Sequence, residues 1–250
     1  MVLDVQINPA AMTWAQLLDE VLRAEGEGFD AVWVYDHLAG RTLGGDRMLE
    51  CFATLGALAV ATERLALGTM VVNMTLRQPA VVAVAAASVQ QISGRPFLLG
   101  LGAGAGPTSR WSAELHVADV DMPPKMADRH ARVEDTLELC RRLWSHDDPE
   151  AASFPKPDPH PVRLVGVNSG ALARLAGQRA DGINLWWGHP QRDELLAAAD
   201  EARGGRPGFV RTCWLADEDG LGDPGHPTHR AVAAAGIDRM IVVRKLAPPP

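Results

Sequence analysis

The sequence predicts an α/β fold, a single (β/α)8 TIM-type barrel over residues 1–250. Short apolar runs rich in β-branched residues alternate with helical patterns along the chain, and eight such runs can be counted. Regular alternation implies parallel strands, and eight of them favour closure into a barrel over an open sheet. The length of 250 residues is also usual for one barrel of this kind.

The stretch from 65 to 106 shows this alternation most clearly. Residues 65–72 and 97–101 are apolar runs of the kind found in strands buried on both faces. The helix expected between them begins at Pro79, whose fixed φ suits a first helical position, and ends at Ser93-Gly94. The second strand then enters a glycine-rich loop, so the stretch reads as one βαβ unit.

The remaining elements complete the barrel. Further strands are expected at 2–7, 29–35, 162–167, 182–186, 208–215 and 237–243, and loops at 39–46 and 103–125. Helices are expected after Thr13, at 49–61, 171–179, 190–202 and 228–235, and around 133–144. Thr13 and Gln16 form a capping box for the first helix, which Gly26 and Gly28 end. The late loops are short and no eighth helix is expected, so exposed apolar barrel surface favours a homodimer or larger homo-oligomer.

Composition excludes several classes of function. The formal net charge of −7 argues against a nucleic acid or an anionic membrane as partner. Cys51, Cys140 and Cys213 lie in apolar runs, as reduced and buried thiols do. The N-terminal residues lack the pattern of a signal peptide, and no apolar run is long enough to span a membrane. We therefore expect a soluble, cytoplasmic, bacterial protein whose partner is a small molecule.

Polar, aromatic and glycine residues gather in the loops that follow the strands, which is the functional face of such a barrel. Asp36-His37 ends the second strand, and His37 either contacts a ligand or merely closes a loop. Gly102-Ala103-Gly104 lets backbone approach a ligand closely, although it is no dinucleotide fingerprint.

Two late loops offer further candidates. Asn168 and Ser169 precede a helix, so they form either a phosphate site or an ordinary N-cap. Trp186 and Trp187 can supply a stacking wall, but neighbouring strand residues face opposite sides, so one of the two belongs to the core.

Two further pairs of polar residues lie in loops. Glu114 and His116 can be substrate contacts or solvated residues, and the sequence does not decide between them. His226 and His229 are interpreted as loop residues, so no metal site is expected.

Three stretches, at 27–38 (EGFDAVWVYDHL), 65–104 and 165–186, resemble the luciferase-like monooxygenase superfamily, and within it the coenzyme F420-dependent oxidoreductases. The resemblance implies a barrel that binds a flavin or deazaflavin at its C-terminal face. It further implies hydride transfer between the deazaflavin C5 and a small organic substrate, with the coenzyme supplying the chemistry.

The resemblance also implies roles for particular positions. His37, next to Asp36, is expected to contact the deazaflavin ring, and a non-prolyl cis peptide at Met70–Val71 to support it. Backbone at Gly102, Ala103, Gly104 and Ala105, and at Val167, Asn168 and Ser169, is expected near the phosphate-bearing tail. Arg77 is a further possible anchor, and Trp186 a further cofactor contact.

Two departures leave alternatives open. Relatives that use FMN often carry an arginine where this chain has Ala103, which favours F420 as the cofactor. Some F420-dependent members place a glutamate as proton donor where this chain has Ala105. An FMN-dependent luciferase-like monooxygenase and a non-catalytic flavin- or deazaflavin-binding barrel therefore remain alternatives.

Overall fold

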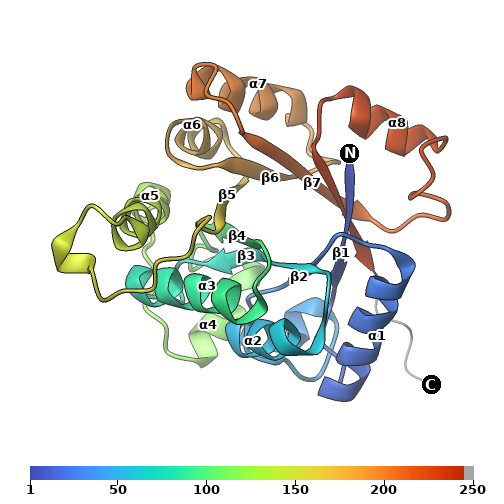
Figure 1. Cartoon of the computed structure of the whole chain (residues 1–250), viewed down its shortest axis with the longest axis horizontal. Coiled ribbons are helices and arrows are strands. Elements are labelled where there is room, and N and C mark those ends of the chain that lie inside the picture. Colours follow the sequence, from blue (N-terminus) through green and yellow to red (C-terminus); the bar gives the residue numbers. More distant parts are fainter. Residues whose placement is uncertain (245–250) are drawn as a thin grey trace.

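The computed structural model describes residues 1–244, and eight parallel strands in it close into a barrel (Figure 1). The strands are β1 (Val2–Ile7), β2 (Ala31–Val34), β3 (Ala66–Asn73), β4 (Phe97–Gly102), β5 (Val162–Val167), β6 (Gly182–Trp186), β7 (Val210–Ala216) and β8 (Arg239–Arg244). Each strand pairs with the strands before and after it, and β8 pairs with β1. The predicted (β/α)8 barrel is confirmed.

Seven helices connect successive strands and surround the barrel (Figure 1). They are α1 (Trp14–Glu27), α2 (Cys51–Ala61), α3 (Pro79–Ser93), α5 (Met126–Trp144), α6 (Gly170–Arg179), α7 (Arg192–Arg203) and α8 (Pro227–Ala234). No helix within residues 1–244 is both long and apolar enough to cross a membrane. The expectation of no eighth helix after β8 concerns residues 245–250, which lie outside the described residues.

Most predicted boundaries differ from the observed ones by at most two residues, but α5 begins seven residues before the range expected around 133–144. Strands β1, β5 and β6 have the predicted ends, and the Thr13–Gln16 capping box is present. Gly26 lies inside α1 and does not end it; Gly28, at φ 91°, is the left-handed cap. Helix α2 starts two residues late because the Glu50 carboxylate caps it, accepting from the Ala53 N–H at 2.6 Å.

The two long segments expected to be loops contain short helices. A 3-10 helix, η1 (Gly40–Leu43), lies in the first, while η2 (Arg110–Ser112) and α4 (Ala113–Val117) lie in the second. The connector before β5 holds a third, η3 (Pro149–Ala151). The expectation that these segments are loops without helices was wrong. A five-residue helix such as α4 is too short to show a helical period in its sequence.

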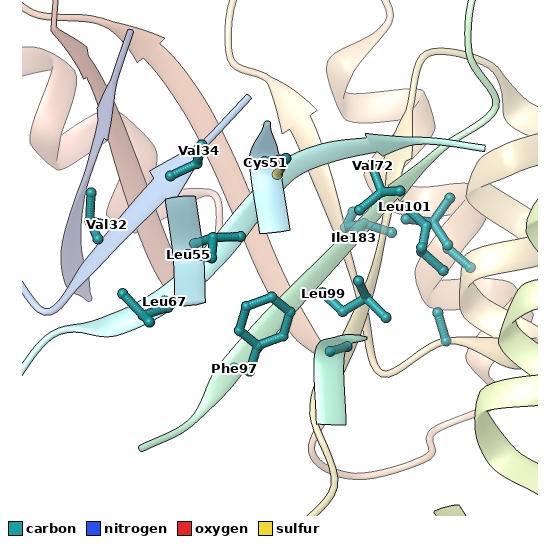
Figure 2. Close-up of a cluster of buried hydrophobic side chains, with 14 of the residues drawn as sticks. Val32, Val34, Cys51, Leu55, Leu67, Val72, Phe97, Leu99, Leu101 and Ile183 are labelled. Atoms are coloured by element: carbon teal, nitrogen blue, oxygen red, sulfur yellow. The ribbon is translucent and has the colours of Figure 1, made fainter. Parts of the chain in front are cut away.

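The largest hydrophobic cluster lies between the strands and the helices. Figure 2 shows Cys51 and Leu55 of α2 beside side chains of β2 and β3 such as Val34 and Leu67. The three cysteines are buried, as predicted, and burial raises the pKa of Cys140 and of Cys213 to about 12. These thiols therefore stay protonated and serve as packing groups.

A second cluster fills the barrel itself, and its floor is polar. Trp33, fully buried, packs over Gly68, where an added Cβ would meet the indole at 2.7 Å. The Trp33 Nε1 donates to Asp4 at 3.0 Å, and the Arg239 guanidinium donates to both oxygens of Asp4 at 2.8 and 2.7 Å. These paired groups close the N-terminal end of the barrel.

Candidate functional site

A cavity of about 600 Å³ opens at the C-terminal ends of the strands, within the usual range for small-molecule sites. The predicted site residues that line it are Asp36, His37, Met70, Val71, Gly102, Ala103, Gly104, Ala105, Val167, Asn168 and Trp186. Arg77 and Ser169 are the two predicted site residues outside this lining. The expected face of the barrel therefore holds a pocket made from most of the expected residues.

His37 is braced by a glutamate from the loop after β4. Its Nδ1 lies 2.8 Å from Oε1 of Glu114, whose other oxygen accepts from the backbone N–H of Leu38 at 3.0 Å and of Ala39 at 2.8 Å. Burial opposes ionisation of Glu114, but these hydrogen bonds outweigh it and hold the pKa of that carboxyl below its usual value. Since a carboxylate only accepts, Nδ1 carries the proton and Nε2 is available to a ligand.

Glu114 is a residue whose role the sequence left undecided. It lies on α4, is 6% exposed, and comes nine positions after Ala105, where the resemblance drew attention to a missing glutamate. The spacing in the chain gave no sign that α4 folds back onto the end of β2. His116 of the same helix has Nε2 2.8 Å from the Pro107 carbonyl oxygen and does not line the cavity.

Arg77 braces the site from outside. Its Nε and Nη2 donate to the Asp36 carboxylate at 2.9 and 2.6 Å, and it also pairs with Glu50. Asp36 accepts a further bond from the Asn73 N–H at 2.9 Å. The guanidinium is therefore held by carboxylates, and it fixes the end of β2 to the loop after β3 where an anchor for the coenzyme was expected.

The Met70–Val71 peptide bond is cis, as the resemblance implied, and the register with β4 shifts between Thr69 and Val72. A Cβ added at Gly102 or at Gly166 would lie 2.5 or 3.3 Å from the γ carbons of Val71. Glycines on β4 and β5 thus make room for Val71, which forms the floor of the cavity.

The wall from β6 and β7 is aromatic. Trp186, 45% exposed, stacks on Trp214 with ring centroids 6.1 Å apart and an interplanar angle of 27°. Trp187 is partly buried, with the Arg192 guanidinium 4.0 Å from its ring centroid. Only one of the neighbouring tryptophans lines the cavity, as strand alternation predicted.

Asn184, below this wall, was missed by sequence reasoning. It is 2% exposed and lines the cavity, and neither Oδ1 nor Nδ2 has a hydrogen-bond partner. The signal available was one amide in the apolar run Gly182–Trp186, which also fits an ordinary core position.

Two further predictions concern helix ends. Ser169 is the N-cap of α6, its Oγ accepting from Leu172 N–H at 3.5 Å, while Asn168 lines the cavity. His226 caps α8, and His229 has Nδ1 3.1 Å from the Leu221 carbonyl oxygen. Within the described residues, no three His, Cys, Asp or Glu side chains gather as a metal site.

Known proteins resemble this chain in sequence and in structure. A family model described as luciferase-like monooxygenase matches residues 2–211. An F420-dependent glucose-6-phosphate dehydrogenase from Intrasporangium calvum is 31% identical over 202 residues, with 74% of this chain and 59% of that protein covered. This chain therefore spans about three fifths of the length of that curated relative.

Solved structures share the fold at low sequence identity. An F420-dependent secondary alcohol dehydrogenase in complex with an F420-acetone adduct has a TM-score of 0.75 at 18% identity, covering 97% of this chain and 93% of that one. Monooxygenase RslO1 from Streptomyces bottropensis has a TM-score of 0.68 at 22% identity, covering 94% and 77%. Because the family model covers most of the sequence, the chain belongs to the luciferase-like monooxygenase family.

Proposed function

We propose that this chain is a coenzyme F420-dependent oxidoreductase that exchanges a hydride between the deazaflavin C5 and a small organic substrate. The observation that carries the proposal is the Glu114–His37 pair, which presents an oriented imidazole to a cavity floored by Val71. The names of the curated relatives support F420 as the coenzyme. A cytoplasmic location and a homodimeric or larger assembly belong to the same proposal.

The residues present fit such a coenzyme. Gly104 lines the cavity at φ 71°, and a Cβ there would collide with Asn73 and Thr75, so this position requires glycine. Backbone from Gly102 to Ala105, together with Val167 and Asn168, would hold the phosphate-bearing tail, and Met70 and Val71 the ring. The bound coenzyme would supply the hydride acceptor.

The chain's own groups bind, orient and move a proton. Glu114 fixes the His37 ring and its tautomer, so Nε2 can hydrogen-bond a substrate oxygen or exchange a proton with it. Tyr35 also lines the cavity, and burial raises its pKa to about 12, so it remains a neutral phenol there. Trp111 also lines the cavity, with its ring centroid 6.3 Å from that of His37, so it can contact a ligand beside the imidazole.

A turnover assay separates this proposal from a non-catalytic binding barrel. Purified protein is mixed with F420 and a panel of alcohols and aldose phosphates, and in the reverse direction with reduced F420 and carbonyl compounds. Substrate-dependent change of the F420 absorbance, absent without protein, supports the proposal. Tight F420 binding with no turnover across the panel in either direction favours the non-catalytic barrel.

A further inference from the structure

The Asn184 amide is a buried polar group with no use in the fold. Both of its polar atoms lack a partner although the side chain is only 2% exposed. Leaving a buried amide unpaired is unfavourable, and most such groups in folded proteins are satisfied. Since Asn184 lines the cavity, its hydrogen bonds can be completed by a ligand.

Its neighbours in the sheet do not complete them. The β5 residue paired with Asn184 is Gly166, which has no side chain. The β7 residue paired with it is Thr212, whose hydroxyl already donates to the Ile183 carbonyl at 2.9 Å. The amide therefore keeps its hydrogen-bonding capacity at the edge of the cavity that it lines.

Gly166 also connects Asn184 to the floor of the site. A Cβ at Gly166 would lie 3.3 Å from Val71, so Val71 and Asn184 adjoin the same glycine. An amide side chain presents an acceptor and a donor side by side, which complements a C(=O)–N–H edge. The pyrimidinedione ring of a deazaflavin carries such an edge.

We propose that Asn184 binds the pyrimidinedione ring of the coenzyme through its carbonyl oxygen and the adjacent N3–H. The inference rests on the proposed function and adds to it a ring-recognition residue on β6. Asn184 then determines affinity for the ring and takes no part in hydride transfer itself.

The test compares two buried amides. Asn184→Leu removes the amide at similar size, and its F420 affinity should fall about tenfold or more, because the ring edge loses its partner. The melting temperature of the ligand-free variant should not fall, since the lost amide had no partner.

Gln6→Met is the matched control: Gln6 is fully buried in β1, its amide is also unpaired, and it does not line the cavity. F420 affinity of that variant should stay within about twofold.

A methylated probe makes the test specific for the ring edge. Binding is measured by fluorescence titration with F420 and with its N3-methyl analogue, which lacks the N3–H donor. The native protein should prefer F420, and Asn184→Leu should lose that preference. Equal F420 affinity of native protein and Asn184→Leu, or an unchanged preference in the variant, overturns the inference. No F420 binding by the native protein overturns the proposed function and this inference with it.

Discussion

The two ends of the barrel treat buried polar groups differently. At the N-terminal end, Asp4 is fully buried and accepts bonds from Trp33 Nε1 and from Nε and Nη2 of Arg239. At the C-terminal end, Asn184 is almost as buried but has no partner, and a cavity lies above it. At the N-terminal end the buried polar groups satisfy one another, while at the C-terminal end hydrogen-bonding capacity remains for a ligand.

The difference between the paired Asp4 and the unpaired Asn184 separates residues that stabilise the fold from residues that can bind a ligand. A satisfied network stabilises the barrel and leaves nothing to bind, whereas unpaired groups next to a cavity cost stability and can bind. Substitutions at the closed end should therefore change the free energy of unfolding, and those at the open end should change binding and turnover.

Asp4→Asn should have the largest effect on stability. It removes the charge that pairs with Arg239, and leaving that guanidinium uncompensated should lower the free energy of unfolding by about 3 kcal/mol. Urea denaturation measures it. Asp46→Asn, which breaks an exposed pair with Arg47, is the control and should leave the free energy of unfolding unchanged within the error of the measurement. Equal effects of the two variants would contradict the distinction between the ends.

His37→Ala should lower turnover with F420 by about a hundredfold, because it removes the oriented imidazole, and should leave the melting temperature nearly unchanged. Steady-state kinetics at saturating F420 provide the measurement. His116→Ala serves as control, since His116 lies near the site but outside the cavity lining. Native rate and native F420 affinity in His37→Ala would remove this histidine from the site.

Glu114→Gln should lower turnover about tenfold, because Gln holds the imidazole less well and does not fix its tautomer. It should also change the pH dependence of stability. The pKa of Glu114 is lowered in the folded protein from its ordinary value of 4.5, so its stabilising contribution is present above pH 4.5 and lost as pH falls through the lowered value. The difference in unfolding free energy between native protein and variant should therefore shrink below pH 4.5. A difference that stays constant from pH 7 to pH 3 would argue against the ionised Glu114.

Trp186→Ala should have the smallest effect. The half-exposed ring should contribute about 1 kcal/mol or less to stability, and ligand affinity should fall about threefold as an aromatic contact is lost. Trp187→Ala is the matched control, because Trp187 packs under Arg192 and not on the cavity. Its melting temperature should fall more, and its ligand affinity less, than in Trp186→Ala; the opposite order would be inconsistent with the assigned wall.

Sequence reasoning recovered the barrel because strand and helix periods are local signals, as β5 and β6 illustrate. It placed His37, Val71 and Asn168 at the cavity because the ends of parallel strands meet on one face. It left the role of Glu114 undecided, missed Asn184, and offered Arg77 as a possible coenzyme anchor without the carboxylates that the structure pairs it with. These three depend on contacts between distant segments: α4 folding back onto β2, an amide left unpaired inside the barrel, and two carboxylates that take up the guanidinium.

The most direct test of the account is a paired titration of the purified native protein with F420 and with FMN, monitored by the fluorescence of each ligand. We expect F420 to bind with at least about tenfold higher affinity than FMN, because the cavity at the C-terminal end of the barrel is assigned to a deazaflavin. Preference for FMN would identify a flavin-dependent relative, and absence of binding to both would contradict the assignment of the cavity to a coenzyme of this kind.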